Sequence, residues 1–163
     1  ASMIKSFANF TILFILSFFL SAPVHSYSDK NSLGNMSAEI LFNNHNEFES
    51  NFNDYVVNNS IDLQALLGMD VFILFGAWCH DSQREVPRLL RILKELGMED
   101  KKIHLIGLDY QKNEPGNRGF DFKVTRTPTF VFQREGIEIG RIEERPTISL
   151  ENHLFEILAA EIN

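Results

Sequence analysis

The apolar residues between positions 69 and 108 fall into three separate stretches. Val71 to Phe75 is an unbroken apolar run, which is the pattern of a strand buried on both faces. From residue 81 to residue 96 the apolar positions recur at helical spacing, and Gly97 follows as a stop signal; these positions are Val86, Leu89, Leu90, Leu93 and Leu96. Residues 103–108 predict a second buried strand. The predicted order is strand, helix, strand.

The rest of the C-terminal half adds a short segment, a hairpin and a helix. The short segment lies around residues 120–122. Residues 130–132 and the alternating isoleucines of residues 137–142 predict two strands, with a turn at residues 133–136. Residues 149–162 predict a terminal helix that begins with Ser as its N-cap. This order predicts an α/β fold with a mixed central sheet flanked by helices.

The N-terminal third gives weaker patterns. Residues 38–67 contain irregularly spaced apolar positions among many asparagines, which predicts one or two helices. Residues 27–37 are polar and turn-rich and predict a flexible leader, so the folded domain is expected over residues 38–163.

The first 26 residues are typical of a secretory signal peptide. Ala1-Ser2 precede Met3 and are interpreted as a cloning remnant. Lys5, the apolar block of residues 10–20 and the small residues near position 22 follow the order of such a signal. An uncleaved membrane anchor is the alternative, but the block is short beside the roughly 20 residues that a span needs. We expect export, to the periplasm or outside the cell, with no stable membrane insertion after cleavage.

Charge and cysteine content narrow the function classes. Lys5 is the sole charged residue before position 27, so the remainder carries 14 basic and 22 acidic residues and a formal charge of −8. This balance argues against a nucleic-acid partner, because phosphate binding needs clustered Lys and Arg. Cys79 is the only cysteine, which excludes an internal disulfide and leaves a reactive or intermolecularly paired thiol.

Cys79 lies where the first predicted strand ends and the helix begins, within Trp78-Cys79-His80-Asp81-Ser82. Helix-end N–H groups stabilise a thiolate there, and His80 and Arg84 add positive charge, whereas Asp81 opposes it. Ser82 either hydrogen-bonds the sulfur or is a polar residue of the first helical turn. An inert core cysteine is the alternative for Cys79 itself.

Over residues 69–163 the chain resembles thioredoxins. The Trp78-Cys79 turn follows the first central strand, and Pro87 lies eight residues later, where the family kinks its active-site helix. Thr127-Pro128 precedes the hairpin where the family has its cis-proline, and Gly136 matches the hairpin glycine. The sequence around Cys79 is similar to that of an exported subgroup, which has a single active-site cysteine in a Cys-x-x-Ser motif. The resemblance implies a thioredoxin fold.

Two departures limit what the resemblance implies. Ser82 stands in place of the resolving cysteine, and Ile73 stands where thioredoxins bury a proton-relaying carboxylate. A full dithiol cycle is therefore not available to this chain alone. The resemblance implies thiol-disulfide exchange with Cys79 as nucleophile and Ser82 beside it, and with Trp78, His80, Thr127 and Pro128 contacting the substrate.

The expected partners are protein thiols and disulfides, with glutathione or another external thiol as co-substrate, no bound cofactor and a monomeric state. A client-binding or retention module without turnover is the alternative. A metal site is not expected, because three consecutive side chains at 79–81 diverge and the other histidines are scattered. A single-cysteine peroxidase lacks support, since residues 75–78 supply no activating Thr.

Overall fold

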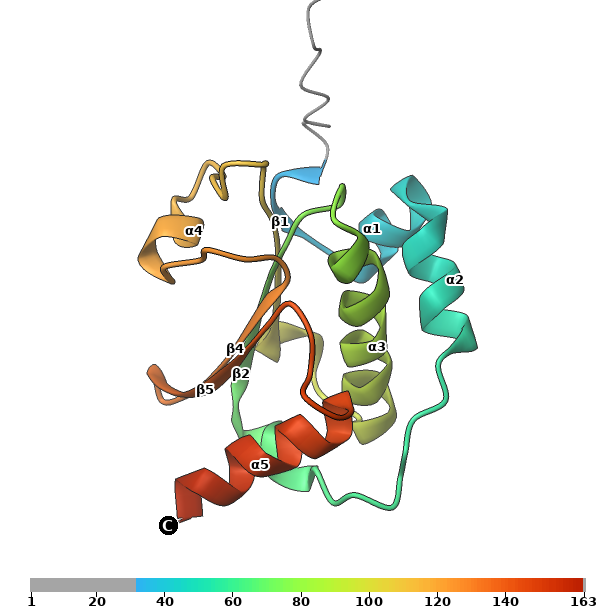
Figure 1. Cartoon of the computed structure of the whole chain (residues 1–163), viewed down its shortest axis with the longest axis vertical. Helices are drawn as coiled ribbons and strands as arrows, with labels where there is room; N and C mark the ends of the chain where they lie inside the picture. Colours follow the sequence, from blue (N-terminus) through green and yellow to red (C-terminus); the bar gives the residue numbers. More distant parts are fainter. Residues whose placement is uncertain (1–31, 163) are drawn as a thin grey trace, which may run out of the picture.

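The structure, a computed structural model, describes residues 32–162 (Figure 1). The predicted signal peptide lies outside these residues. The strands are β1 (Gly34–Met36), β2 (Asp70–Phe75), β3 (Ile103–Gly107), β4 (Thr129–Arg134) and β5 (Ile137–Glu143). The helices are α1 (Ala38–Asn44), α2 (Asn46–Asp54), α3 (His80–Leu96), α4 (Arg118–Asp121) and α5 (Leu150–Ile162), with the 3-10 helices η2 (Gln64–Gly68) and η3 (Asp100–Lys102).

The five strands form one mixed sheet in the order β1-β3-β2-β4-β5. β2 and β3 are parallel and are connected through α3, whereas the other neighbouring strands are antiparallel. β2 lies in the centre, and four of its six residues are buried. The α/β class with a mixed central sheet flanked by helices is confirmed.

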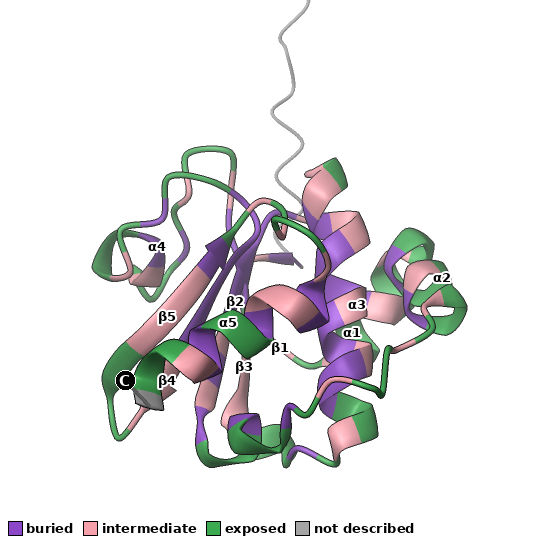
Figure 2. Cartoon of the chain, turned by 60° about the horizontal axis from the view of Figure 1, so that its bottom comes forward, coloured by how far each residue is buried: buried purple, intermediate pink, exposed green. Residues whose placement is uncertain are grey.

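The two faces of the sheet are covered unequally. The larger core joins one face to α1, α2, α3 and α5, and Figure 2 shows that the strands and the inner side of α3 hold most of the buried residues. A smaller cluster covers the opposite face, next to the α4 segment; it contains Leu74, Ile106, Leu108, Val124 and Val131. Within the described residues no helix is long and apolar enough to cross a membrane.

Helix α3 fixes where the Cys79 turn lies. It starts directly after Cys79, the N-cap, whose backbone is extended, and ends at Gly97, whose left-handed φ of 78° closes the helix. Leu89, Ile92 and Leu93 on its inner side have no exposed surface. Burial of this stripe holds α3 against the sheet and so holds its first turn at the end of β2.

Two details differ from the sequence expectation. Residues 34–36, assigned to the flexible leader 27–37, form β1 and pair with β3, so the folded part begins before residue 38. The hairpin turn is also shorter than predicted, because Gln133 and Arg134 belong to β4 and leave Glu135-Gly136 as the turn. Both turn residues have positive φ, which the glycine adopts without strain.

Candidate functional site

Cys79 lies at the junction of β2 and α3. The turn that carries it is closed by a hydrogen bond from its N–H to the carbonyl of Gly76 at 2.9 Å, and its own carbonyl accepts the N–H of Gln83 at 2.9 Å. The residue is half-buried and unpaired with any other cysteine, since the chain has no second one. The sulfur therefore sits at the N-terminal end of a 17-residue helix, where the helix dipole favours negative charge.

The sulfur contacts the loop before β4. The Cys79 thiol donates to the carbonyl oxygen of Thr127 at 3.1 Å, although 48 residues separate the two in sequence. The Thr127–Pro128 peptide bond is cis, and both residues are buried. Of the residues expected to contact substrate, Thr127 and Pro128 are thus the ones that the fold brings to the sulfur.

Ser82 lies on the inner side of α3 and has no exposed surface. Its hydroxyl oxygen accepts the N–H of Gly76 at 3.3 Å. Within the described residues, the hydrogen bond of the Cys79 sulfur goes to Thr127 and not to Ser82. Of the two interpretations left open by the sequence, the geometry matches a first-turn polar residue, which here ties the start of α3 to the end of β2.

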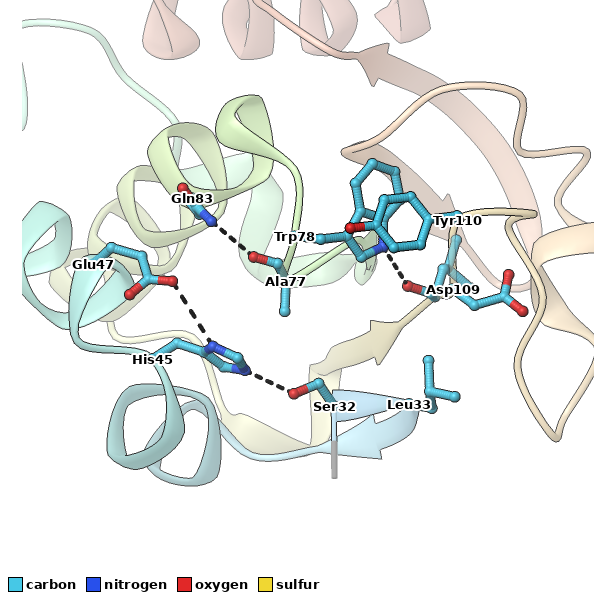
Figure 3. Close-up of a pocket in the computed structure, with 10 residues that line it drawn as sticks. Ser32, Leu33, His45, Glu47, Ala77, Trp78, Gln83, Asp109 and Tyr110 are labelled. Carbon is cyan, nitrogen blue, oxygen red and sulfur yellow. Dashed lines mark hydrogen bonds and ion pairs between the residues drawn. The ribbon is translucent and has the colours of Figure 1, made fainter. Parts of the chain in front are cut away.

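Trp78 is held by the loop that follows β3 (Figure 3). Its indole N–H donates to the carbonyl of Leu108 at 3.2 Å, and its ring stacks on Tyr110 with centroids 4.2 Å apart. The Lys112 ammonium lies 5.0 Å from the ring centroid. A Cβ on Gly76 would come within 2.5 Å of the indole, so glycine is required for this close approach. Trp78 is therefore a fixed wall beside Cys79.

The loop that holds Trp78 is itself anchored by a buried ion pair. The Glu114 carboxylate accepts from the Arg118 guanidinium at 2.8 Å and from the N–H of Gly116 at 2.7 Å. The pKa of Glu114 is lowered to about 2, mainly by the hydrogen bond from the Arg118 side chain. The backbone N–H groups of Arg118 and Gly116 lower it further. Arg118 also donates to the side chain of Asn35 in β1. The loop is thus tied to the edge strand.

Asp81 is paired in the structure and not left as an isolated charge. Arg145, from the segment after β5, approaches its carboxylate at 2.9 Å, and Arg84 approaches it at 3.2 Å. These cations offset the repulsion that the sequence analysis expected between Asp81 and a Cys79 thiolate. The sequence pointed to Arg84 but not to Arg145, because 64 residues separate Arg145 from Asp81. His80 is exposed at the start of α3.

Ile73 is fully buried in β2, so an apolar side chain fills the place where the family resemblance implied a carboxylate in thioredoxins. Besides Glu114, two buried carboxylates lie on the helices, Glu85 in α3 and Glu151 in α5. Glu85 is 2% exposed and contacts Arg84 at 2.5 Å and Arg88 at 3.4 Å. Six residues of helix, about 9 Å along the axis, separate it from Cys79.

The second buried carboxylate, Glu151, also holds structure together. It accepts the hydroxyl of Tyr55 at 2.9 Å and the N–H of Asn58 at 3.0 Å. Burial of the phenol, followed by this hydrogen bond, raises the pKa of Tyr55. Among the described residues, no three His, Cys, Asp or Glu side chains are grouped so that they could hold a metal ion.

No family model matches the chain, and a search of curated proteins found no match. Among solved structures, a protein of unknown function from Pseudomonas aeruginosa is 16% identical, with 84% of this chain and 97% of that chain covered and a TM-score of 0.52. Mitochondrial thioredoxin 3 from Saccharomyces cerevisiae is 23% identical, with 57% and 85% covered and a TM-score of 0.41. Fasciola hepatica thioredoxin is 24% identical, with 50% and 73% covered and a TM-score of 0.36.

The likeness at these identities concerns the fold alone. The described residues have an α/β fold with a mixed five-stranded sheet flanked by helices, as the sequence predicted. Thioredoxins are among the solved structures that the chain is similar to. The narrower assignment to an exported, single-cysteine subgroup stays a prediction.

Proposed function

We propose that this protein carries out thiol-disulfide exchange through Cys79 alone. The observation that supports this most strongly is the place of the chain's one cysteine: half-buried, at the N-terminus of α3, with its sulfur 3.1 Å from the Thr127 carbonyl. An inert core cysteine would be expected away from a helix N-terminus and enclosed by apolar side chains.

The first step is attack by the Cys79 thiolate on a sulfur of a client disulfide. A new S–S bond forms between Cys79 and the client, the client's own S–S bond breaks, and the leaving sulfur departs as a thiolate that takes up a proton from water. Thr127 and Pro128 border the attacking sulfur, and Trp78 forms a wall beside it. Their proposed role is to hold the client chain.

The second step needs a thiol from outside the chain. The thiolate of glutathione, or of another external thiol, attacks the mixed disulfide, and the client leaves as a thiol once its sulfur is protonated. A second external thiol then frees Cys79, and the two external thiols end as one disulfide. If the client's own freed thiolate attacks instead, the net reaction is isomerisation. A glutathione adduct on a client would be removed by the same steps.

Retention of clients without turnover is the second candidate. It is favoured by the absence of any other cysteine in the chain, because a mixed disulfide then has no internal route of release. The two functions differ only in whether the mixed disulfide is turned over.

Turnover with excess glutathione separates the two candidates. The protein is incubated with a disulfide-bonded client, and the free client thiol and the mixed disulfide are both measured by mass spectrometry. A catalyst releases many equivalents of reduced client per protein, whereas a retention module stops at one equivalent of adduct. Cys79→Ser is the control and should do neither. Full activity in that variant would overturn the proposal.

The proposed compartment follows from the N-terminal sequence. Residues 3–26 support export to the periplasm or outside the cell, where disulfide-bonded clients are found. The proposed partners are protein thiols and disulfides, without a bound cofactor, and the proposed state is monomeric.

A further inference from the structure

A cavity of about 230 Å³ lies beside the Cys79 turn, between the N-terminal segment and the loop after β3 (Figure 3). Leu33, Ala77, Trp78 and Leu108 give it a mainly apolar wall. Pockets for small-molecule ligands usually have about 300–1,000 Å³, so this volume suits a single large side chain better than a separate ligand. Because Ala77 and Trp78 directly precede Cys79, that side chain would belong to a molecule already bound at the sulfur.

The polar side of the cavity is negative. Glu47, in the first turn of α2, is directed toward His45 at the cavity, and its side chain remains 45% exposed (Figure 3). The Ser32 hydroxyl lies 2.7 Å from Nε2 of His45. Nδ1 of His45 lies 3.8 Å from the Glu47 carboxylate, which is too long for a hydrogen bond and is an ion pair only when the imidazole is protonated. The carboxylate of Asp109 points away from the cavity and accepts a hydrogen bond from the N–H of Asn113.

The residues that line this cavity include no lysine or arginine. A ligand with an apolar stem and a positive end therefore fits both halves of the site. The methylene groups of a lysine or arginine can lie on Leu33, Ala77 and Leu108 while the charged end reaches Glu47 at the open rim. A glutathionyl group carries two carboxylates and one ammonium, so its net charge is negative and it matches Glu47 less well than a lysine or arginine.

We propose that this cavity is a specificity subsite for a basic side chain of the client polypeptide, close in sequence to the client cysteine that reacts with Cys79. This inference rests on the proposed function and names its substrate class. An extended chain advances about 3.3 Å per residue, so a lysine or arginine within about three positions of the client cysteine can reach a wall that begins one residue from Cys79. Clients with an acidic residue at that position are disfavoured.

The test uses short peptides with one cysteine activated as a mixed disulfide with thionitrobenzoate. Cys79 attacks the peptide sulfur, a Cys79–peptide disulfide forms, and the coloured thionitrobenzoate anion leaves. Three peptides differ only in having Lys, Leu or Glu two residues from the cysteine. For the full chain we expect the Lys peptide to react about threefold faster than the Leu peptide, and the Glu peptide to react slowest. The expected factor is small because a single, partly exposed ion pair contributes little free energy.

Glu47→Gln should remove the advantage of the Lys peptide over the Leu peptide. Glu49→Gln is the matched control, because it lies in the same helix, lines a different cavity and changes the net charge equally. That control should keep the threefold preference, which separates a local subsite from steering by the overall negative charge. Thermal melting of both variants checks that the fold is intact.

Four other outcomes would overturn the inference or its premise. Equal rates for all peptides, or equal effects of the two substitutions, would exclude a subsite at Glu47 while leaving exchange at Cys79 intact. A Leu peptide that reacts fastest would indicate an apolar occupant and overturn the assignment to basic clients. No reaction with any peptide would contradict the proposed function itself.

Discussion

Replacing Ser82 with cysteine tests the single-thiol mechanism most directly. Ser82 lies three residues after Cys79 in the first turn of α3. In helical geometry that spacing places two Cα atoms about 5 Å apart, which is within the roughly 4.4–6.8 Å that a disulfide spans. Ser82→Cys should therefore create a dithiol pair that can close without moving the backbone.

The same substitution has a structural cost that can be worked out beforehand. The Ser82 hydroxyl accepts the buried N–H of Gly76, and sulfur is a weaker acceptor than oxygen. The loss should be about 1 kcal/mol of unfolding free energy, or a fall in Tm of about 3–6 °C for a domain of this size. Ser82→Ala has the same loss without a new thiol and serves as the matched control.

The assay follows the decay of a preformed mixed disulfide between Cys79 and a client peptide, in the absence of external thiol. Wild type and Ser82→Ala should hold the adduct. Ser82→Cys should release the peptide at least tenfold faster, because the second thiol attacks from within the same molecule at an effective concentration of millimolar or more. Equal decay in Ser82→Cys and Ser82→Ala, or rapid decay in wild type, would refute the reasoning.

Three further substitutions test the surroundings of the site. The pKa of Glu114 is lowered in the folded protein, so the stability that its carboxylate contributes is present above about pH 4.5 and is lost as the pH falls toward 2. Glu114→Gln should therefore lower the free energy of unfolding, measured in urea, by roughly 1–3 kcal/mol at pH 7 and by less at pH 3. Arg145→Ala should slow iodoacetamide alkylation of Cys79 about twofold at low salt, because Asp81 loses a counter-charge. Gly76→Ala should cost about 1–3 kcal/mol and shift the tryptophan fluorescence.

Each of these three has a result that would count against it. An equal loss for Glu114→Gln at both pH values would mean that the carboxylate charge does not matter. The alkylation difference for Arg145→Ala should vanish in high salt, and Arg126→Ala, which breaks an exposed pair with Glu144, should leave the rate unchanged. Unchanged fluorescence and stability in Gly76→Ala would mean that the indole can move without cost.

The sequence predicted the centre of the fold because the central strands and α3 have strong patterns of their own. Residues 71–75 are a continuous apolar run, residues 103–107 are apolar except for His104 and Gly107, and α3 has a regular apolar stripe. β1 has only three residues and no such pattern. It forms because it pairs with β3, where Gly107 leaves room for the backbone of Ser32, whose carbonyl lies 1.8 Å from the place of a Cβ. A partner so far along the chain could not be read from local sequence.

The candidate site likewise has features that the local sequence predicts and features that it does not. The position of Cys79 at a strand–helix junction was visible from the pattern, since it depends on neighbouring residues. The pairing of Asp81 with Arg145 and the cavity beside Trp78 were not, because they join segments that are 64 and more than 30 residues apart. The sequence therefore indicated Cys79 and, through the family resemblance, Thr127 and Pro128 beside it, but neither Arg145 nor the cavity.

The surroundings of Cys79 also bear on how the proton of each leaving thiol is supplied. Ile73 is apolar and has no proton to give. Glu85 contacts two arginines through Oε1, while its buried Oε2 has no hydrogen-bond partner, and Glu151 accepts from a phenol and a backbone N–H. Glu85 lies six residues along α3 from Cys79, and Glu151 is bonded to the Tyr55 phenol, so under the proposed function the protons at the sulfur would come from water, from exposed His80 or from the external thiol itself. Release would then depend on the thiolate fraction of that external thiol. If Cys79 acts as proposed, the rate of client release would then follow the redox state of the compartment in which the protein works.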